Sequence, residues 1–139
     1  MSNAYKEGYL ELERGDAILA AKKFNEAELL FPQSIWASKS AIMAAYAYYS
    51  QNYFNDSIYE LERFIKTYPN NTNISYAKYL LAMNYYEIIV DETKDLKSVM
   101  EAKRQFKIVI KDYPSTEFAM DAKFKLDMIN EILAAKEMY

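Results

Sequence analysis

The side chains that most often carry acid–base or metal chemistry are scarce in this sequence. It contains no His and no Cys among its 139 residues, which removes the commonest general base, the commonest metal ligand and every thiolate. Carboxylates two residues apart occur several times, as at Glu11 and Glu13. On a helix this spacing places them on different faces, so they do not form a working acid–base pair. The sequence therefore predicts no catalytic site and no cofactor.

A cation site is the remaining chemical candidate, and the sequence argues against it. Asp91, Glu92 and Asp95 lie close together, but the turn glycine of a regular calcium-binding loop does not accompany them. We expect these carboxylates to be solvated in a loop. Neither a glycine-rich phosphate loop nor a nucleophile elbow occurs.

Tyrosine is the residue type whose number is unusual, with 14 copies. A phenol combines a rigid apolar ring with a hydrogen-bonding tip, and aromatic side chains of this kind often dominate binding energies at protein interfaces. The chemistry that the sequence favours is therefore non-covalent recognition of other polypeptides. Where the tyrosines lie depends on the elements that carry them.

Three similar phrases around proline indicate an internal repeat. They are Leu30-Phe31-Pro32-Gln33-Ser34, Thr67-Tyr68-Pro69-Asn70-Asn71 and Asp112-Tyr113-Pro114-Ser115-Thr116. Proline pushes the preceding residue out of the α region, so a helix ends there, and the polar residues that follow can cap the next helix. The prolines are 69 − 32 = 37 and 114 − 69 = 45 residues apart. This is close to the period of about 34 residues in tetratricopeptide repeats.

Positions at fixed distances before each proline support the repeat. The twelfth position is always small, which lets two helices approach, and the eighth is always large and apolar. Counting twelve, eight and five residues back gives Ala20, Ser57 and Ala102, then Phe24, Leu61 and Phe106, then Ala27, Phe64 and Val109. The third repeat has a surplus of eight residues, and we expect them to form a lengthened loop within 90–98.

These signals predict an all-α tetratricopeptide-repeat superhelix of three helical hairpins plus one further helix. We expect one domain over 4–139, with repeats at about 4–32, 34–69 and 73–114 and an extra helix at 115–138. Residues 1–3 look like a cloning remnant. The predicted helices are 4–14, 16–30, 34–51, 54–68, 73–90, 95–113 and 115–138. Plausible caps are Asp16, Asn55 or Asp56, and Ser115, with a tight turn at Gly15.

The first helix of each hairpin lines the concave surface of such a stack, and helical geometry then selects the side chains that face inward. The predicted peptide-binding residues are Tyr5, Tyr9, Ile42, Tyr46, Tyr49, Tyr76, Tyr79, Met83 and Tyr86. Tyr48 and Tyr85 point instead toward the hairpin cores. The competing interpretation is that tyrosines at helical spacing pack in the core or between helices.

The last predicted helix carries two apolar stripes rather than one. Phe118, Ala122, Leu126, Ile129 and Leu133 form the first stripe. Met120, Phe124 and Met128, with Ala135 and Met138, form a second on nearly the opposite side. One interpretation is a long helix with some surface methionine. The other is that further repeats cover this stripe in the natural protein, and that the present chain self-associates through Met120, Phe124 and Met128.

The composition argues against two further classes of protein, those that bind nucleic acid and those that span a membrane. The net charge is −3, and acids and bases are interspersed without an evident basic stripe, so nucleic acid is not an expected partner. No apolar run approaches the roughly 20 residues of a membrane span, and no signal peptide is apparent.

The sequence resembles the BamD (ComL) family of bacterial outer-membrane assembly lipoproteins over essentially all of residues 5–139. No catalytic signature contributes to the resemblance. It is carried by Tyr5 with Gly15 and Phe31-Pro32, by Tyr46-Ala47-Tyr48-Tyr49, by Arg63-Phe64-Ile65, by Asn73-Ile74-Ser75-Tyr76 with Tyr79, by Ala102-Lys103-Arg104-Gln105-Phe106 leading to Tyr113-Pro114-Ser115, and by Asp121-Ala122.

The resemblance implies a non-enzymatic lipoprotein with five tetratricopeptide repeats on the periplasmic face of the outer membrane, in the β-barrel assembly (BAM) complex. The implied partners are unfolded outer-membrane β-barrel proteins, whose aromatic-ended signal the N-terminal repeats receive, and other subunits of the complex. The implied membrane attachment is a lipid on an N-terminal Cys, which this chain lacks. About three and a half repeats are present. The alternative is a generic periplasmic tetratricopeptide adaptor for cell-envelope enzymes.

Overall fold

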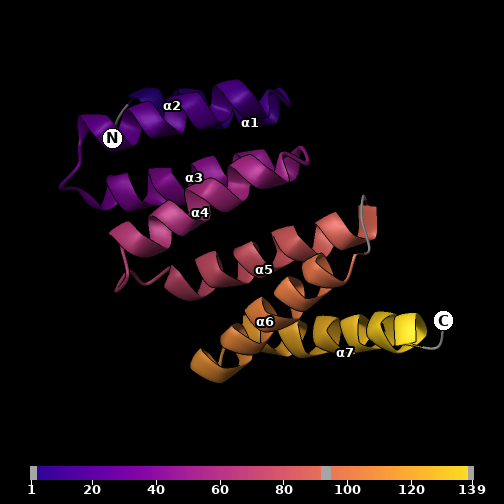
Figure 1. The fold of residues 1–139 in the computed structure, drawn as a ribbon. Coiled ribbons are helices and arrows are strands. Elements are labelled where there is room, and N and C mark those ends of the chain that lie inside the picture. The colour runs from indigo at the N-terminus through magenta and orange to yellow at the C-terminus, as the bar shows by residue number, and fades with distance from the viewer. Residues whose placement is uncertain (1–2, 92–94, 138–139) are drawn as a thin grey trace. The chain divides into compact units, whose positions relative to one another are not determined.

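The structure, a computed structural model, describes residues 3–91 and 95–137 (Figure 1). Over these ranges the chain is helical and forms no strand, which confirms the predicted all-α class. The helices are α1 (Asn3–Glu13), α2 (Ala17–Leu30), α3 (Ile35–Ser50), α4 (Phe54–Thr67), α5 (Ile74–Asp91), α6 (Leu96–Asp112) and α7 (Glu117–Glu137).

The chain divides into two compact units, residues 1–71 and 72–139. In the first unit α1 packs against α2, α2 against α3 and α3 against α4. In the second unit α6 packs against both α5 and α7, and α5 also contacts α7. A single domain over 4–139, as the sequence suggested, stays a prediction.

The three aromatic–proline phrases form the same turn three times. Phe31, Tyr68 and Tyr113 each end a helix with φ between −125° and −134° and ψ between 54° and 64°. In each turn the aromatic residue's carbonyl accepts a hydrogen bond from the N–H three residues later, at 3.1, 3.1 and 3.2 Å. The sequence repeat is thus a repeat of backbone geometry.

The repeat positions lie in the cores of both units. All nine residues found twelve, eight and five positions before the prolines are 0% exposed. At the small position of the second hairpin, Ser57 donates a 2.9 Å hydrogen bond to the carbonyl of Ala45 on α3. The hydroxyl is therefore satisfied where the two helices approach, and the small residue sets their spacing.

The surplus residues of the third repeat mainly lengthen its helices, so the predicted long loop over 90–98 is wrong. Helix α5 has 18 residues and α6 has 17, against 16 in α3 and 14 in α4. The longer helices bury Ile89 and Val99, both 0% exposed, in one core cluster. That burial favours added helical turns over a polar loop. Residues 92–94 lie outside the described chain.

Helix caps and turns follow the predictions in part. Asp16 caps α2 by accepting from the N–H of Leu19 at 3.0 Å, and Gly15 has φ +84° in the tight turn before it. Helix α4 begins after Tyr53, with no side-chain cap, so the predicted caps at Asn55 and Asp56 are wrong. Helix α7 is capped by Thr116, whose Oγ1 accepts from Ala119 N–H at 3.2 Å, and not by Ser115.

A half-buried ion-pair network joins α2 to α4 inside the first unit. The Arg63 guanidinium donates to both oxygens of Glu28, at 3.1 and 2.6 Å, and to Glu60 at 3.1 Å. These hydrogen bonds, led by the one to Glu28, raise the pKa of Arg63. The Tyr68 hydroxyl also donates to Glu28, at 2.6 Å. Burial, followed by this bond, raises the pKa of Tyr68 to about 12.

Gly8 on α1 lies directly against the ring of Phe24 on α2. A Cβ added to Gly8 would lie 2.8 to 2.9 Å from three ring atoms of Phe24, closer than carbon atoms tolerate. Phe24 is fully buried, so its ring has no free space to move into. Glycine is required here by the packing of α2 against α1.

Candidate functional site

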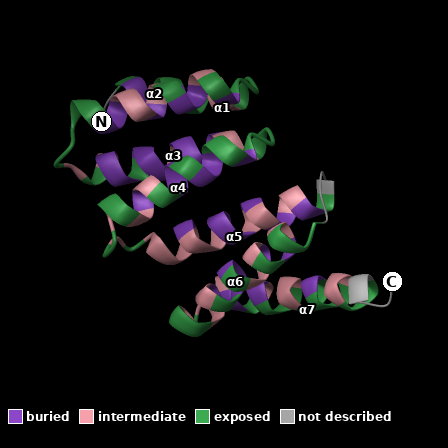
Figure 2. Cartoon of the chain, in the orientation of Figure 1, coloured by how far each residue is buried: buried purple, intermediate pink, exposed green. Residues whose placement is uncertain are grey.

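The nine predicted binding residues are divided between the two units. Tyr5 and Tyr9 lie on α1, and Ile42, Tyr46 and Tyr49 lie on α3, all in the first unit. Tyr76, Tyr79, Met83 and Tyr86 lie on α5 in the second unit. Figure 2 shows that each of these helices carries buried, intermediate and exposed residues. The nine side chains therefore differ in exposure, and only the exposed and half-buried ones can form part of a surface.

In the first unit, Tyr5 and Ile42 belong to the interior, with 9% and 6% exposure. The Tyr5 ring packs edge-on against Phe24 at 5.5 Å and Trp36 at 5.1 Å between ring centroids. Burial, followed by the neighbouring Tyr9 hydroxyl, raises the pKa of Tyr5. These contacts stabilise the packing of α1, and they leave Tyr5 little surface with which to meet a ligand.

The exposed aromatic surface of the first unit is formed by α1 and α3. Tyr9 and Tyr46 are 40% and 38% exposed. The Tyr9 hydroxyl lies 3.7 Å from the sulfur of Met43, and Met43 precedes Tyr46 by three residues, so both share one face of α3. Tyr49, half-buried, lies three residues further along. We call Tyr9, Met43, Tyr46 and Tyr49 the α1–α3 tyrosine surface.

Met43 is a member of this surface that the sequence analysis did not select. A methionine between tyrosines adapts its shape to apolar groups because its side chain is unbranched and polarizable. The signal that would have found it is its position three residues before Tyr46 on the same helix face.

In the second unit, the tyrosines of α5 pack against α7. Tyr79 stacks on Phe118 at 5.2 Å between ring centroids, and Tyr76 lies tilted against the same ring at 5.6 Å. The Tyr79 hydroxyl donates to Asp121. Tyr76 and Tyr79 keep part of their surface exposed. Each of these rings therefore has a structural role, whatever else it contacts.

Tyr86 lies deepest among the predicted residues of α5. It is 8% exposed, its ring meets Phe106 at 6.1 Å, and its hydroxyl lies 3.6 Å from the sulfur of Met128. Burial, followed by the carboxylates of Glu87 and Asp121, raises the pKa of Tyr86. Met83 is half-buried and packs against the same core cluster. Tyr86 therefore contributes to the core between α5, α6 and α7.

The second stripe of α7 is largely at the surface, as the helical pattern indicated. Met120 and Phe124 are 73% and 63% exposed, and Met128 is 38% exposed. The opposite stripe faces inward, with Ala122 and Ile129 fully buried. Met138 lies outside the described residues.

Within residues 3–91 and 95–137, no group of three or more acidic side chains is arranged to hold a metal ion. No helix in the same ranges combines the length and apolar character needed to cross a bilayer.

Repeated helical hairpins, buried repeat positions and aromatic surfaces on the first helices define a helical-repeat protein of the tetratricopeptide type. The family model described as "YfiO: Outer membrane lipoprotein" matches residues 1–139. The chain belongs to this family, and it is thereby associated with the outer membrane.

Several curated proteins named outer membrane protein assembly factor BamD are similar to the chain. The one from Caulobacter vibrioides is 40% identical over 134 residues, covering 96% of this chain and 44% of that protein. The one from Rickettsia prowazekii is 31% identical over 138 residues, covering 99% and 55%. The one from Xylella fastidiosa is 26% identical over 148 residues, covering 99% and 51%. The chain thus spans about half the length of the curated relatives it matches.

Proposed function

We propose that this chain is a non-enzymatic, polypeptide-binding part of an outer-membrane protein assembly factor that acts on the periplasmic face of the outer membrane. Its clients would be unfolded outer-membrane β-barrel proteins, and its other partners would be subunits of the same assembly machinery. The names of the relatives support this function over that of a generic adaptor for cell-envelope enzymes.

The observation that carries the proposal is the α1–α3 tyrosine surface. Tyr9 and Tyr46 expose more than a third of their area on the first helices of two successive hairpins. Rings that are held by their own helices lose little entropy when a ligand binds, and their hydroxyl tips can meet backbone groups of an extended strand. An aromatic-ended segment fits such a surface by ring–ring contact.

Six of the nine predicted residues remain available for this role. Tyr9, Tyr46, Tyr49, Tyr76, Tyr79 and Met83 are at least partly exposed. Tyr5, Ile42 and Tyr86 are buried, so they would support the surface from beneath. The proposal does not require the buried residues to contact a client.

We expect Tyr46→Ala to weaken binding of a peptide that copies the aromatic-ended C-terminal strand of an outer-membrane barrel protein. Loss of one aromatic anchor should reduce the affinity about tenfold or more. Isothermal titration of the peptide into the purified chain measures this change. Tyr59→Ala is the matched control, because Tyr59 is 67% exposed on α4, the second helix of the same hairpin. Equal affinities for the wild type and both variants would exclude the tyrosine surface.

We also propose that the exposed stripe of α7 mediates self-association of the isolated chain. Met120→Glu with Phe124→Glu should hold the chain monomeric at concentrations where the wild type associates, because the charges would be buried in the contact. Light scattering across a dilution series measures the mass. The control is Ile18→Glu with Leu29→Glu, which charges two apolar residues of α2 that are 55% and 80% exposed. A wild type that stays monomeric throughout the series would refute the idea.

A further inference from the structure

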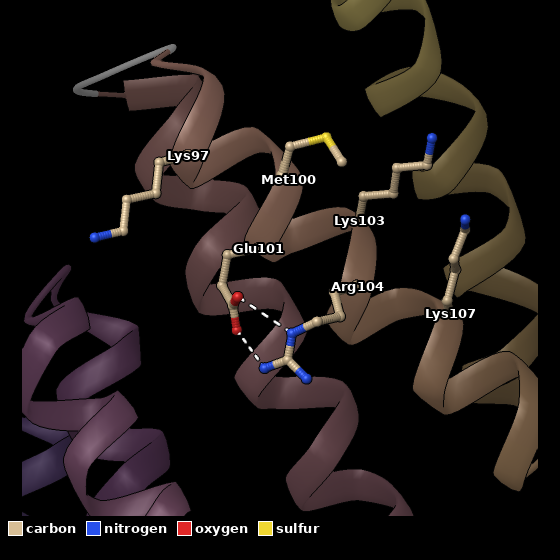
Figure 3. Close-up of a pocket in the computed structure, with 6 residues that line it drawn as sticks. All are labelled: Lys97, Met100, Glu101, Lys103, Arg104 and Lys107. Atoms are coloured by element: carbon tan, nitrogen blue, oxygen red, sulfur yellow. Dashed lines mark hydrogen bonds and ion pairs between the residues drawn. The ribbon is translucent and has the colours of Figure 1, made fainter.

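The outward face of α6 carries a dense group of basic side chains, which is not evident from the net charge of −3 for the whole chain. A surface cavity of about 480 Å³ runs along this helix, and the residues that line it are Lys97, Met100, Glu101, Lys103, Arg104 and Lys107. Figure 3 shows all of them on α6, with Arg104 held to Glu101 and with Lys103 and Lys107 projecting in the same direction. The earlier expectation that no basic stripe is present is therefore wrong for this helix.

The helical step of about 100° per residue shows how one-sided the charge is. The core side of α6 holds Val99, Ala102, Phe106 and Val109, all fully buried. An outer arc about 120° wide by the same step, running from Lys103 to Lys97, contains no carboxylate. It holds Lys97, Lys103, Arg104, Lys107 and Lys111 together with the apolar Leu96 and Met100. We call this set the α6 basic face.

Most of the charge on this face is not neutralised within the part of the chain that the structure describes. Glu101 lies about 40° beyond Lys97, just outside the arc, and its carboxylate is bound to Arg104 at 2.7 Å. None of Lys97, Lys103, Lys107 and Lys111 forms an ion pair with a described residue. In a chain with a net charge of −3, this face is locally cationic.

Helix α4 shows that such a face is not a general property of second helices in this fold. Its exposed residues include Asp56 and Glu62 beside Lys66, so acids and bases are mixed along it. The segregation of lysine onto one side of α6 therefore calls for a partner that bears negative charge.

We propose that the α6 basic face lies against an anionic phospholipid surface. Lys97 and Lys111 are fourteen residues apart, so the face extends about 21 Å along one helix. Lysine ammonium groups attract anionic headgroups, and membranes bind helices that combine such cations with apolar side chains. Leu96 and Met100, 59% and 47% exposed, would enter the boundary between headgroups and acyl chains.

Two observations favour a lipid surface over an acidic polypeptide. The chain belongs to a family described as an outer membrane lipoprotein, which brings it near a membrane. The described residues that line the cavity all lie on α6, so its lysines and its exposed apolar side chains form one extended strip along a single helix. The proposal does not depend on client binding by the α1–α3 tyrosine surface, which lies in the other unit.

The test is flotation of the purified chain with vesicles made of phosphatidylglycerol and phosphatidylcholine in equal parts. The triple variant Lys97→Gln, Lys107→Gln and Lys111→Gln should bind about a hundredfold more weakly than the wild type, at about fivefold per cation. Binding of the wild type should also fall as salt shortens the screening length from about 10 Å at 0.1 M to about 3 Å at 1 M. Vesicles of phosphatidylcholine alone should bind neither protein.

The matched control is Lys6→Gln, Lys22→Gln and Lys66→Gln, three exposed lysines of the first unit. Both triple variants change the net charge from −3 to −6, so only the position of the lost charge differs. The control should bind vesicles almost as well as the wild type, and circular dichroism should show all three proteins equally helical. Equal losses in the two variants would reduce the effect to net charge and overturn the proposal.

Two other outcomes would also overturn it. The first is a wild-type chain that does not bind anionic vesicles at low salt. The second is binding of polyglutamate that depends on Lys97, Lys107 and Lys111 without any binding of vesicles, which would assign the face to an acidic polypeptide. Met100→Ser leaves the charge unchanged, and severalfold weaker vesicle binding by that variant would support insertion of the side chain.

Discussion

Replacing Arg63 with alanine is expected to lower the free energy of unfolding by roughly 2–4 kcal/mol. Arg63 is the cation between two carboxylates, Glu28 and Glu60, that are each 8% exposed. Without the guanidinium these two charges would remain in the interior with no ionic partner. The expected loss is below that of a fully buried pair, because the Arg63 side chain is 32% exposed and water screens part of the interaction.

Urea denaturation followed by far-ultraviolet circular dichroism measures this loss. Arg104→Ala is the control, because Arg104 and Glu101 form an ion pair of the same i,i+3 spacing in which the arginine is 60% exposed. That variant should lose no more than about 1 kcal/mol. Arg63→Lys should fall between wild type and Arg63→Ala, since lysine restores the charge without the two-pronged contact. Similar losses in Arg63→Ala and Arg104→Ala would contradict a special role for the network.

Replacing Phe24 with alanine is expected to cost about 3–5 kcal/mol, the usual range for a buried phenylalanine. Phe24 is fully buried, with 0% of its surface exposed to water, and its ring makes edge contacts with Tyr5 and Tyr9. Gly8→Ala should cost about 1–3 kcal/mol on its own, because the new methyl group would overlap the Phe24 ring.

The double variant Gly8→Ala with Phe24→Ala tests whether overlap with the Phe24 ring causes the loss of stability in Gly8→Ala. In the Phe24→Ala background the added methyl group enters space that the ring has left, so the combined loss should be clearly smaller than the sum of the two single losses. Fluorescence of Trp36, the only tryptophan of the chain, follows unfolding of the first unit. Strict additivity would show that Gly8 is needed for a reason other than contact with Phe24.

The repeat could be predicted from sequence because its signals are local. Proline ends a helix wherever it occurs after an aromatic residue in this chain, and residues at fixed distances before it, such as Phe24, Leu61 and Phe106, are buried in every hairpin. Each of these inferences needs only the backbone chemistry of one phrase and the periodicity of one helix.

The insertion in the third hairpin could not be predicted in the same way. A surplus of charged and polar residues suits a loop as well as it suits added helical turns. What decides between them is the burial of Ile89 together with Val99 in one cluster, and that contact joins two helices. Periodicity within either helix does not contain this information.

The exposure of individual tyrosines was also beyond sequence reasoning. Helical spacing places Tyr5 and Tyr9 on one face of α1, four residues apart, and the structure buries Tyr5 while leaving Tyr9 40% exposed. The difference arises from Trp36, which packs against Tyr5 from α3. The position of that ring depends on how the helices pack, which no single helix specifies.

The α6 basic face was missed because charge was assessed over the whole chain. Lys97, Arg104, Lys107 and Lys111 are interspersed in sequence with acidic, polar and apolar residues, and only the helical step brings them to one side. A helical-wheel examination of 96–112 would have found them.

The extensive helix contacts of the first unit have a consequence for how this region folds. Each of these contacts joins two helices that are consecutive along the chain. Little chain entropy is therefore lost in bringing the two helices together. Proteins dominated by sequence-local contacts reach the native state far faster than those that must pair distant strands. Because the chain has no cysteine, no disulfide exchange delays this process, and the aromatic surface on α1 and α3 should assemble in a rapid main phase.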